Sequence, residues 1–232
     1  MKISTFACEM ANNTNKYMLK ACLFDLDGVV FDTEPQYTEF WGSQCRLYHP
    51  ERPGLEHEIK GSTLDQILGR WWSGSLESER RHVVHRLNAF EAQMRFNYVP
   101  DFIPFVVDLR QHGVRTAVVT SSNNLKMQAV YRQRPEFVNL FDAIYTSEDF
   151  SESKPSPQCY QLAAHRFVVL PQECLVFEDS INGLKSGRAA EMGVVALTTT
   201  NPLERVVPYS DYQIPDYTNI NFDLLQIIWQ VI

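Results

Sequence analysis

Short, nearly continuous apolar segments recur along the chain, and stretches with helical character separate them. Four segments are rich in β-forming residues and a fifth is weaker; they span residues 19–25, 113–121, 142–147 (the weaker one), 174–179 and 193–199. Strands of this type are covered on both faces, and strands that alternate with helices form parallel sheets. The predicted fold class is therefore α/β, with a doubly wound parallel sheet.

The predicted helices between these strands span residues 102–112, 125–134, 157–167 and 181–192, and the tail is expected to form a crossover segment and a terminal helix. Residues 34–99 interrupt this alternation, because they contain no convincing strand. Apolar residues there recur at the spacing of one helical face: Val83, Val84, Leu87, Phe90 and Met94. We therefore predict a core formed by residues 17–33 and 100–232, and a helical insert at 34–99.

Composition and charge exclude several classes of function. The net charge of −7 comes without any basic block, so a nucleic-acid partner is not expected. No apolar run is long enough to span a membrane, and the first twenty residues lack the apolar stretch of a secretory signal. The five cysteines are scattered without a CxxC pair, which favours a reducing compartment over a zinc site. We expect a cytoplasmic monomer.

Two acids, Asp25 and Asp27, follow the first predicted strand directly, although neighbouring carboxylates repel each other. In open α/β sheets, ligands bind beyond the carboxyl ends of the strands. Polar groups from other segments are expected at the same edge of the sheet: Thr120 after the second strand, Lys154 in a loop, and Glu178 and Asp179 at the end of the 174–179 strand. The sequence thus predicts a polar site at this edge.

A divalent cation would relieve the repulsion between the carboxylates. Magnesium prefers oxygen ligands and is usually held by one or two carboxylates together with a substrate phosphate. Asp25 and Asp179 could supply those carboxylates. An aspartate beside the metal can attack phosphorus, while Asp27 lies near enough to protonate the leaving oxygen and then deprotonate water. Lys154 and the Thr120 hydroxyl would hold the phosphoryl oxygens.

Taken singly, each of these residues also has an ordinary structural interpretation. Asp25 and Asp27 could form a solvated turn or part of a calcium loop, although the further acids of such a loop are missing. Thr120, Glu178 and Asp179 could instead cap helices, and Lys154 could be a solvated surface residue.

Four motifs in order resemble those of the haloacid dehalogenase-like hydrolases, and the resemblance extends from about Leu19 onward. They are DxDG followed by "DTEP" (residues 25–35), "AVVTSS" ending the second strand, "SKPSP" around Lys154, and "FEDSINGLKSGRAAEMG" from Phe177. The resemblance implies a Rossmann-like core with a small all-helical cap domain, inserted after the first strand, that closes over the pocket and sets specificity.

The resemblance also implies roles for the site residues. Asp25 would be the nucleophile and Asp27 the general acid and base. Mg²⁺ would be bound by Asp25, the backbone carbonyl of Asp27, and Asp179. Glu178 would belong to the same metal site, where it would orient the neighbouring lysine or a metal-bound water.

The chain is similar to the phosphatase and β-phosphoglucomutase-like branch of this family, and it shares the "KG" cap motif as Lys60-Gly61. Tyr37 and Leu64 stand where the mutases have a histidine and an arginine, which favours hydrolysis. Substrate contacts are expected from the cap and the second motif: Glu34, Lys60, Ser121, Ser122 and Asn124. The predicted function is a magnesium-dependent phosphatase for a small phosphomonoester such as a sugar phosphate. The alternatives are a sugar-phosphate mutase, a pyrophosphatase, or a non-catalytic binding protein.

Overall fold

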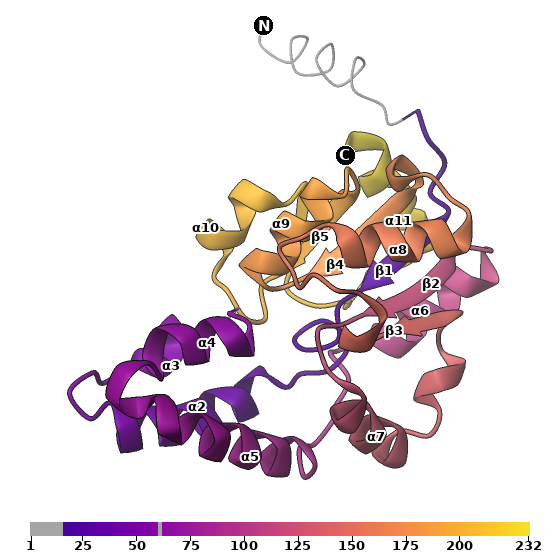
Figure 1. Ribbon diagram of the computed structural model, residues 1–232. Coiled ribbons are helices and arrows are strands. Elements are labelled where there is room, and N and C mark those ends of the chain that lie inside the picture. The colour runs from indigo at the N-terminus through magenta and orange to yellow at the C-terminus, as the bar shows by residue number, and fades with distance from the viewer. Residues whose placement is uncertain (1–15, 60–61) are drawn as a thin grey trace, which may run out of the picture.

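The computed structural model describes residues 16–59 and 62–232, and its centre is a six-stranded, wholly parallel sheet (Figure 1). The strand order is β3-β2-β1-β4-β5-β6. The strands are β1 (Ala21–Phe24), β2 (Arg115–Val119), β3 (Ala143–Tyr145), β4 (Cys174–Glu178), β5 (Gly193–Leu197) and β6 (Tyr212–Ile214). This arrangement confirms the predicted α/β fold, with a helical insertion after β1.

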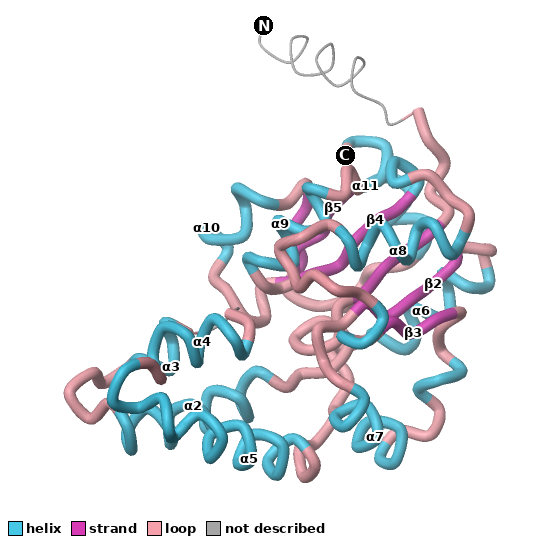
Figure 2. Tube along the Cα trace, in the orientation of Figure 1, coloured by secondary structure: helices cyan, strands magenta, loops and turns pink. Residues whose placement is uncertain are grey.

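Helices cover both faces of the sheet (Figure 2). One face packs against α6 (Phe102–Gln111), α7 (Asn124–Gln133) and α11 (Phe222–Val231), and the other against α8 (Gln158–Phe167), α9 (Ile181–Ala189) and α10 (Leu203–Val206). Strand β1 shows why: Cys22 and Phe24 point to the first face, whereas Ala21 and Leu23 point to the second. Because side chains alternate along a strand, a strand buried on both faces must be apolar throughout.

The helical insert consists of α2 (Glu34–Tyr48), α3 (Leu55–Glu58), α4 (Leu64–Trp71), a 3-10 turn (Gly74–Glu79) and α5 (Arg80–Glu91), and these helices group together beside the sheet (Figure 1). It has an apolar cluster of its own, whose buried members are Phe40, Trp41, Cys45, Leu55, Ile59, Ile67, Leu68, Trp72, Val83 and Leu87. A capping box between Thr63 and Gln66 starts α4. This separate apolar cluster is consistent with a core and an insert that each have their own packing. The domain bounds at 33/34 and 99/100 stay a prediction.

The sequence predicts a crossover segment where the structure has strand β6, Tyr212–Ile214. The segment pairs in parallel with Val195–Leu197 at the sheet edge. A three-residue edge strand with Tyr212 exposed has too few residues to show the alternation that marks a strand.

The predicted apolar face in the insert extends one turn too far. Val83 and Leu87 are buried on α5, but the helix ends at Glu91. Met94 lies beyond that end and packs into the core beside the sheet instead. None of the described helices is both long and apolar enough to cross a membrane.

The aromatic cluster beneath the sheet allows a test of the core. Phe24 is fully buried, with its ring centroid 4.8 Å from that of Phe177 and 5.4 Å from that of Phe102. We expect Phe24→Ala to lower the free energy of unfolding by about 3–5 kcal/mol, because it removes apolar contacts and leaves a cavity. Ile227→Ala, at a side chain 63% exposed on α11, should change it by less than about 0.5 kcal/mol. Urea unfolding followed by circular dichroism measures both, and similar losses would contradict this packing.

Candidate active site

The ends of three neighbouring strands bring the predicted polar residues together. Strand β1 lies between β2 and β4, and Asp25, Thr120 and Asp179 each follow the last residue of one of these strands. Glu178 is the last residue of β4 itself. Parallel strands end at the same edge of a sheet, which explains how residues more than 150 positions apart come into contact.

Lys154 reaches this edge from the loop before α8 and is almost fully buried, with 4% of its surface exposed. Its ammonium donates hydrogen bonds to Asp25 Oδ1 (2.6 Å), Glu178 Oε1 (2.8 Å) and the Val119 carbonyl (2.9 Å). Burial alone would lower the pKa of Lys154, but the carboxylates of Asp25 and Glu178 outweigh burial and raise the pKa well above its ordinary value. The side chain is therefore a permanent positive charge beside Asp25.

Glu178 uses both carboxylate oxygens within the protein. Its Oε1 accepts from Lys154 and from the Tyr160 hydroxyl (3.2 Å). Its Oε2 accepts from the backbone N–H groups of Asp179 and Ser180 and from the Ser180 hydroxyl, each at 3.0 Å. These contacts fix Glu178 as the residue that holds Lys154 in place.

Asp25, Glu178 and Asp179 form an acidic cluster in which one carboxylate oxygen of each lies within 4.8 Å of the others. Burial raises the pKa of Asp25 to about 7; Lys154 opposes this shift and Glu178 adds to it. Burial likewise raises the pKa of Asp179 well above its usual range, and the charges of Glu178 and Asp25 add to the effect. Carboxylates crowded in this way, with one lysine among them, fit a hard divalent cation.

Gly28 allows the loop after β1 to approach this cluster. Its φ of +73° lies in the left-handed region, and a Cβ there would be 1.9 Å from Asp179 Oδ2. The Thr200 hydroxyl also bonds to this Asp179 oxygen. Only glycine combines that backbone conformation with the required space.

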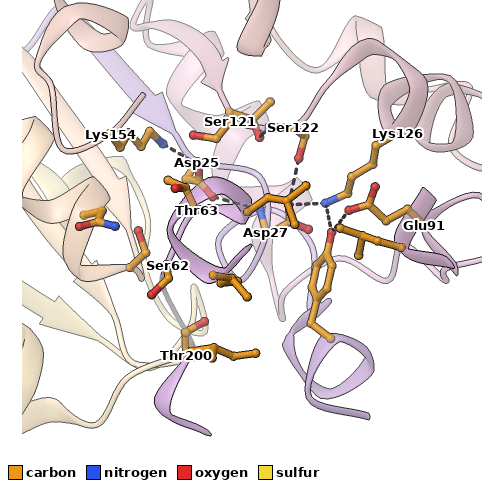
Figure 3. A pocket seen from close by; sticks show the side chains of 18 of the residues that line it. Asp25, Asp27, Ser62, Thr63, Glu91, Ser121, Ser122, Lys126, Lys154 and Thr200 are labelled. Atoms are coloured by element: carbon orange, nitrogen blue, oxygen red, sulfur yellow. Dashed lines mark hydrogen bonds and ion pairs between the residues drawn. The ribbon is translucent and has the colours of Figure 1, made fainter. Parts of the chain in front are cut away.

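Asp27 sits in a different environment from Asp25, as Figure 3 shows. Its Oδ1 accepts a hydrogen bond from the Thr33 hydroxyl (2.7 Å), and its Oδ2 accepts one from the Ser122 hydroxyl (3.1 Å). The ammonium of Lys126 forms an ion pair with the same Oδ2. The backbone N–H of Asp27 donates to Asp25 Oδ2 (3.1 Å), so the two acids are directly connected.

A cavity of about 440 Å³ opens between this edge and the helical insert. Eight predicted site residues line it: Asp25, Asp27, Glu34, Thr120, Ser121, Ser122, Lys154 and Asp179. The insert contributes apolar and polar walls, including Tyr37, Trp41, Ile59, Ser62, Thr63, Leu64 and Asn88. A cavity of this size suits a small-molecule ligand.

Three predicted site residues do not line the cavity or cannot be placed. Glu178 lies behind Lys154. Asn124 does not line the cavity: its backbone N–H donates to Glu148 and its side-chain oxygen accepts from Thr146, whereas Asn123 does line it. Lys60 lies outside the described residues.

Lys126, which the sequence-based prediction of the site does not include, also lines the cavity and contacts Asp27. A lysine in a predicted helix is ordinarily a solvated residue. One signal was available: Lys126 stands in the first turn of the helix that follows the second strand, and the first turn of such a helix faces the carboxyl edge of the sheet.

Packing at Gly183 tests the position of Glu178. A Cβ at Gly183 in α9 would lie 1.6 Å from Glu178 Oε1. Although alanine favours helices, we expect Gly183→Ala to destabilise the protein by about 1–3 kcal/mol, since Glu178 would have to move. Gly69→Ala is the matched control, because a Cβ there meets nothing within 4 Å and should stabilise α4 by up to about 1 kcal/mol. Thermal unfolding measures the change in stability of each variant. Changes of the same sign in the two variants would contradict the described packing around Glu178.

Comparisons with known proteins agree with this geometry. The family model described as haloacid dehalogenase-like hydrolase matches residues 19–191. Hexitol phosphatase A of Escherichia coli is 31% identical over 187 residues, which cover 77% of this chain and 82% of that protein. A probable pseudouridine-5'-phosphatase of Saccharomyces cerevisiae is 28% identical over 205 residues, covering 76% of this chain and 81% of the relative.

A crystal structure of a HAD hydrolase (family IA, variant 3) from Entamoeba histolytica shares the fold. Its TM-score is 0.76 at 19% identity, and the match covers 91% of this chain and 99% of that one. The fold, the order of the four motifs and the family match all lead to the same conclusion: the chain belongs to the haloacid dehalogenase-like hydrolases.

Proposed function

We propose that this hydrolase is a phosphatase, which cleaves a small phosphomonoester such as a sugar phosphate through an aspartyl-phosphate on Asp25. The observation that carries the proposal is the contact of Asp25 with the buried Lys154 ammonium at 2.6 Å, with Asp27 two residues further on. This contact supports a site in which a nucleophile, a fixed positive charge and a second acid share one cavity.

In the first step, the Asp25 carboxylate attacks phosphorus. The bond between Asp25 and phosphorus forms as the bond from phosphorus to the leaving oxygen breaks, and Asp27 donates a proton to that oxygen. Lys154 and the Thr120 hydroxyl are placed to bind the phosphoryl oxygens as their charge changes. The Glu178 carboxylate, which takes no part in bond formation, also raises the pKa of Lys154 and so favours its charged form during this step.

In the second step, water attacks the aspartyl-phosphate. Asp27 accepts the proton of this water, the bond between phosphorus and Asp25 breaks, and inorganic phosphate leaves. The backbone N–H of Asp27 donates to Asp25 Oδ2, which holds that oxygen of the Asp25 carboxylate beside Asp27. The general acid of the first step is therefore the general base of the second.

The residues present fit a magnesium ion. Asp25 and Asp179 would hold it together with the backbone carbonyl of Asp27, whereas Glu178 would position Lys154, because both its oxygens already accept hydrogen bonds. When bound, Mg²⁺ would neutralise the carboxylates and the phosphoryl oxygens and so lower the barrier to attack.

Hydrolysis is favoured over phosphoryl transfer between two positions of a sugar. The mutases need a second cationic grip in the cap, and the described residues that line the cavity include two cations, Lys126 and Lys154, both ion-paired with site carboxylates. Leu64 lines the cavity where the mutases have an arginine. The Tyr37 hydroxyl, at the position of the mutase histidine, is bonded to Glu91.

The substrate class rests on the cavity and on the relatives. The cavity is small and its insert side offers hydroxyl, amide and aromatic groups, which suit a polyol. One relative is named for hexitol phosphates and another for pseudouridine 5'-phosphate, both phosphomonoesters of polyhydroxylated molecules. We propose that the helical insert is the cap that sets substrate specificity. The residues expected to contact the substrate are Glu34, Lys60, Ser121 and Ser122.

The cellular setting also remains a proposal. The described cysteines Cys22, Cys45, Cys159 and Cys174 are buried free thiols, which suits a reducing compartment such as the cytoplasm. The net charge of −7 supports a small phosphorylated metabolite rather than nucleic acid as the partner. We propose a monomer.

Phosphate release tests the activity. We expect Mg²⁺-dependent release of inorganic phosphate from one or more members of a panel of hexitol phosphates, sugar phosphates, nucleotides and pyrophosphate. Asp25→Asn should lower kcat at least about a thousandfold, because the nucleophile is lost. Asp32→Asn is the matched control: Asp32 belongs to the same motif but is exposed, so the variant should keep full activity.

An Asp25→Asn variant that retains wild-type release would contradict the proposal. A folded wild type that releases no phosphate but converts β-glucose 1-phosphate to glucose 6-phosphate would establish the mutase instead.

Thermal stability tests the metal site independently of activity. Mg²⁺ at a hundredfold excess over its Kd should stabilise the wild type by about 2.7 kcal/mol, because it binds only the folded acidic cluster. Asp179→Asn removes one of the proposed ligands and should abolish most of this shift. NaCl at matched ionic strength controls for simple screening. The same Mg²⁺ shift in both proteins would place the ion elsewhere.

A further inference from the structure

The loop that follows β5 carries three consecutive polar side chains that the mechanism above does not use. They are Thr199, Thr200 and Asn201, and none of the four motifs includes them. Asn201 is 2% exposed, and Thr200 lies in the wall of the cavity (Figure 3). Buried polar groups need hydrogen-bond partners, so the partners of this loop indicate what it holds in place.

All three side chains donate to segments of the proposed metal site. The Thr199 hydroxyl donates to the Gly28 carbonyl oxygen at 2.6 Å. The Thr200 hydroxyl donates to Asp179 Oδ2, and the Asn201 side-chain amide donates to the Asp179 carbonyl oxygen at 2.9 Å. The carboxylate and the backbone of Asp179 are therefore both held by one loop.

The same loop joins two segments that are not neighbours in the sheet. Strand β5 pairs with β4 and not with β1, so Thr199 reaches past the end of β4 to the loop after β1. Gly28 directly follows Asp27, whose backbone carbonyl is a proposed ligand. A Cβ at Gly28 would lie 1.9 Å from Asp179 Oδ2 and 2.9 Å from Thr200 Oγ1, so these groups meet in the space of one side chain.

This arrangement holds one oxygen of Asp179 and leaves the other for a cation. Among the described residues, Thr200 donates to Oδ2 and no hydrogen bond reaches Oδ1. Mg²⁺ requires near-ideal octahedral geometry, with ligands at about 2.0–2.1 Å, so it tolerates little movement of a ligand. Groups that hydrogen-bond to a ligating carboxylate fix its orientation and thereby its affinity for the metal.

We propose that Thr199, Thr200 and Asn201 form a clamp that positions two of the proposed Mg²⁺ ligands, the Asp179 carboxylate and the Asp27 carbonyl, before the ion binds. The proposal rests on the Mg²⁺ site of the proposed function. The clamp residues are positioning residues: they act on the ion through its ligands, and their loss should weaken the affinity for Mg²⁺ rather than the chemical step.

The affinity of the metal-free protein for Mg²⁺ tests this role without any measurement of activity. Thermal unfolding after treatment with EDTA, repeated over a series of Mg²⁺ concentrations, gives the apparent Kd. Thr200→Val keeps the shape of the side chain and removes the donor, so it should raise this Kd by about 10- to 100-fold. Thr200→Ser keeps the hydroxyl and should bind Mg²⁺ as the wild type does.

A second position tests the link to the loop after β1. Thr199→Val removes the donor to Gly28 and should raise the Kd by about 10-fold, at the lower end of the range, because it acts on the Asp27 carbonyl through the backbone. Thr198→Val is the matched control. Thr198 directly precedes the clamp, its backbone N–H donates to Ile214, and it does not line the cavity, so the Kd should not change.

Two further readouts separate positioning from other roles. A purely structural role of Thr200 would lower the melting temperature in EDTA and leave the Kd for Mg²⁺ unchanged. A role in binding the substrate would leave a loss of phosphate release at saturating Mg²⁺. We expect Thr200→Val to need more Mg²⁺ for half-maximal release and to regain the wild-type kcat at saturation.

An unchanged Kd in folded Thr200→Val would overturn the proposal. A lower Kd would also overturn it, because Thr200 would then compete with the ion for Asp179. If Thr200→Val does not fold, Thr199→Val decides in its place, and an unchanged Kd there has the same meaning.

The proposed function and the clamp can fail separately. A wild type that is stabilised by Mg²⁺ but releases no phosphate would contradict the phosphatase, while the Kd values of the variants would still decide the clamp. A wild type that Mg²⁺ does not stabilise would overturn the clamp.

Discussion

The buried contact of Lys154 with Asp25 and Glu178 is the interaction on which the site depends. It places one positive charge among three carboxylates at the end of β1 and β4, where a lone acid or a lone lysine would be costly to bury. The surrounding chain accommodates it: Gly28 and Gly183 leave room where any Cβ would collide with Asp179 or Glu178. The net excess of negative charge in this cluster fits a divalent cation, as the proposed function requires.

The two aspartates of the first motif lie in contrasting environments although only one residue separates them. Asp25 belongs to the core network, and its partners come from the loop before α8 and from backbone groups of the sheet edge. Asp27 belongs to a network of side chains, Thr33, Ser122 and Lys126, that leads into the helical insert. The proposed nucleophile is therefore held by contacts within the core, and the proposed general acid by contacts that reach the insert.

The sequence predicted the features that depend on local pattern. Five of the six strands show as apolar runs, and the strand-end rule places Asp25, Thr120 and Asp179 together. Strand β6 has three residues, too few for periodicity to mark. Lys126 is harder to predict, because its helix has the pattern of a solvated helix and only its position in the first turn after the second strand indicates the cavity. The sequence predicts Asn124 as a substrate contact, but its neighbour Asn123 lines the cavity instead. A one-residue difference in the start of α7 decides which of the two lines it.

The most direct test of the account is to identify the residue that carries the phosphoryl group. Asp27→Asn should react once with dinitrophenyl phosphate, because that leaving group needs no proton, and then stall without its general base. We predict a burst of dinitrophenolate equal to the enzyme concentration, and acid-quenched protein whose mass has increased by one phosphoryl group that maps to Asp25. A burst with the label on another residue, or continued phosphate release with none on the protein, would contradict the aspartyl-phosphate on Asp25.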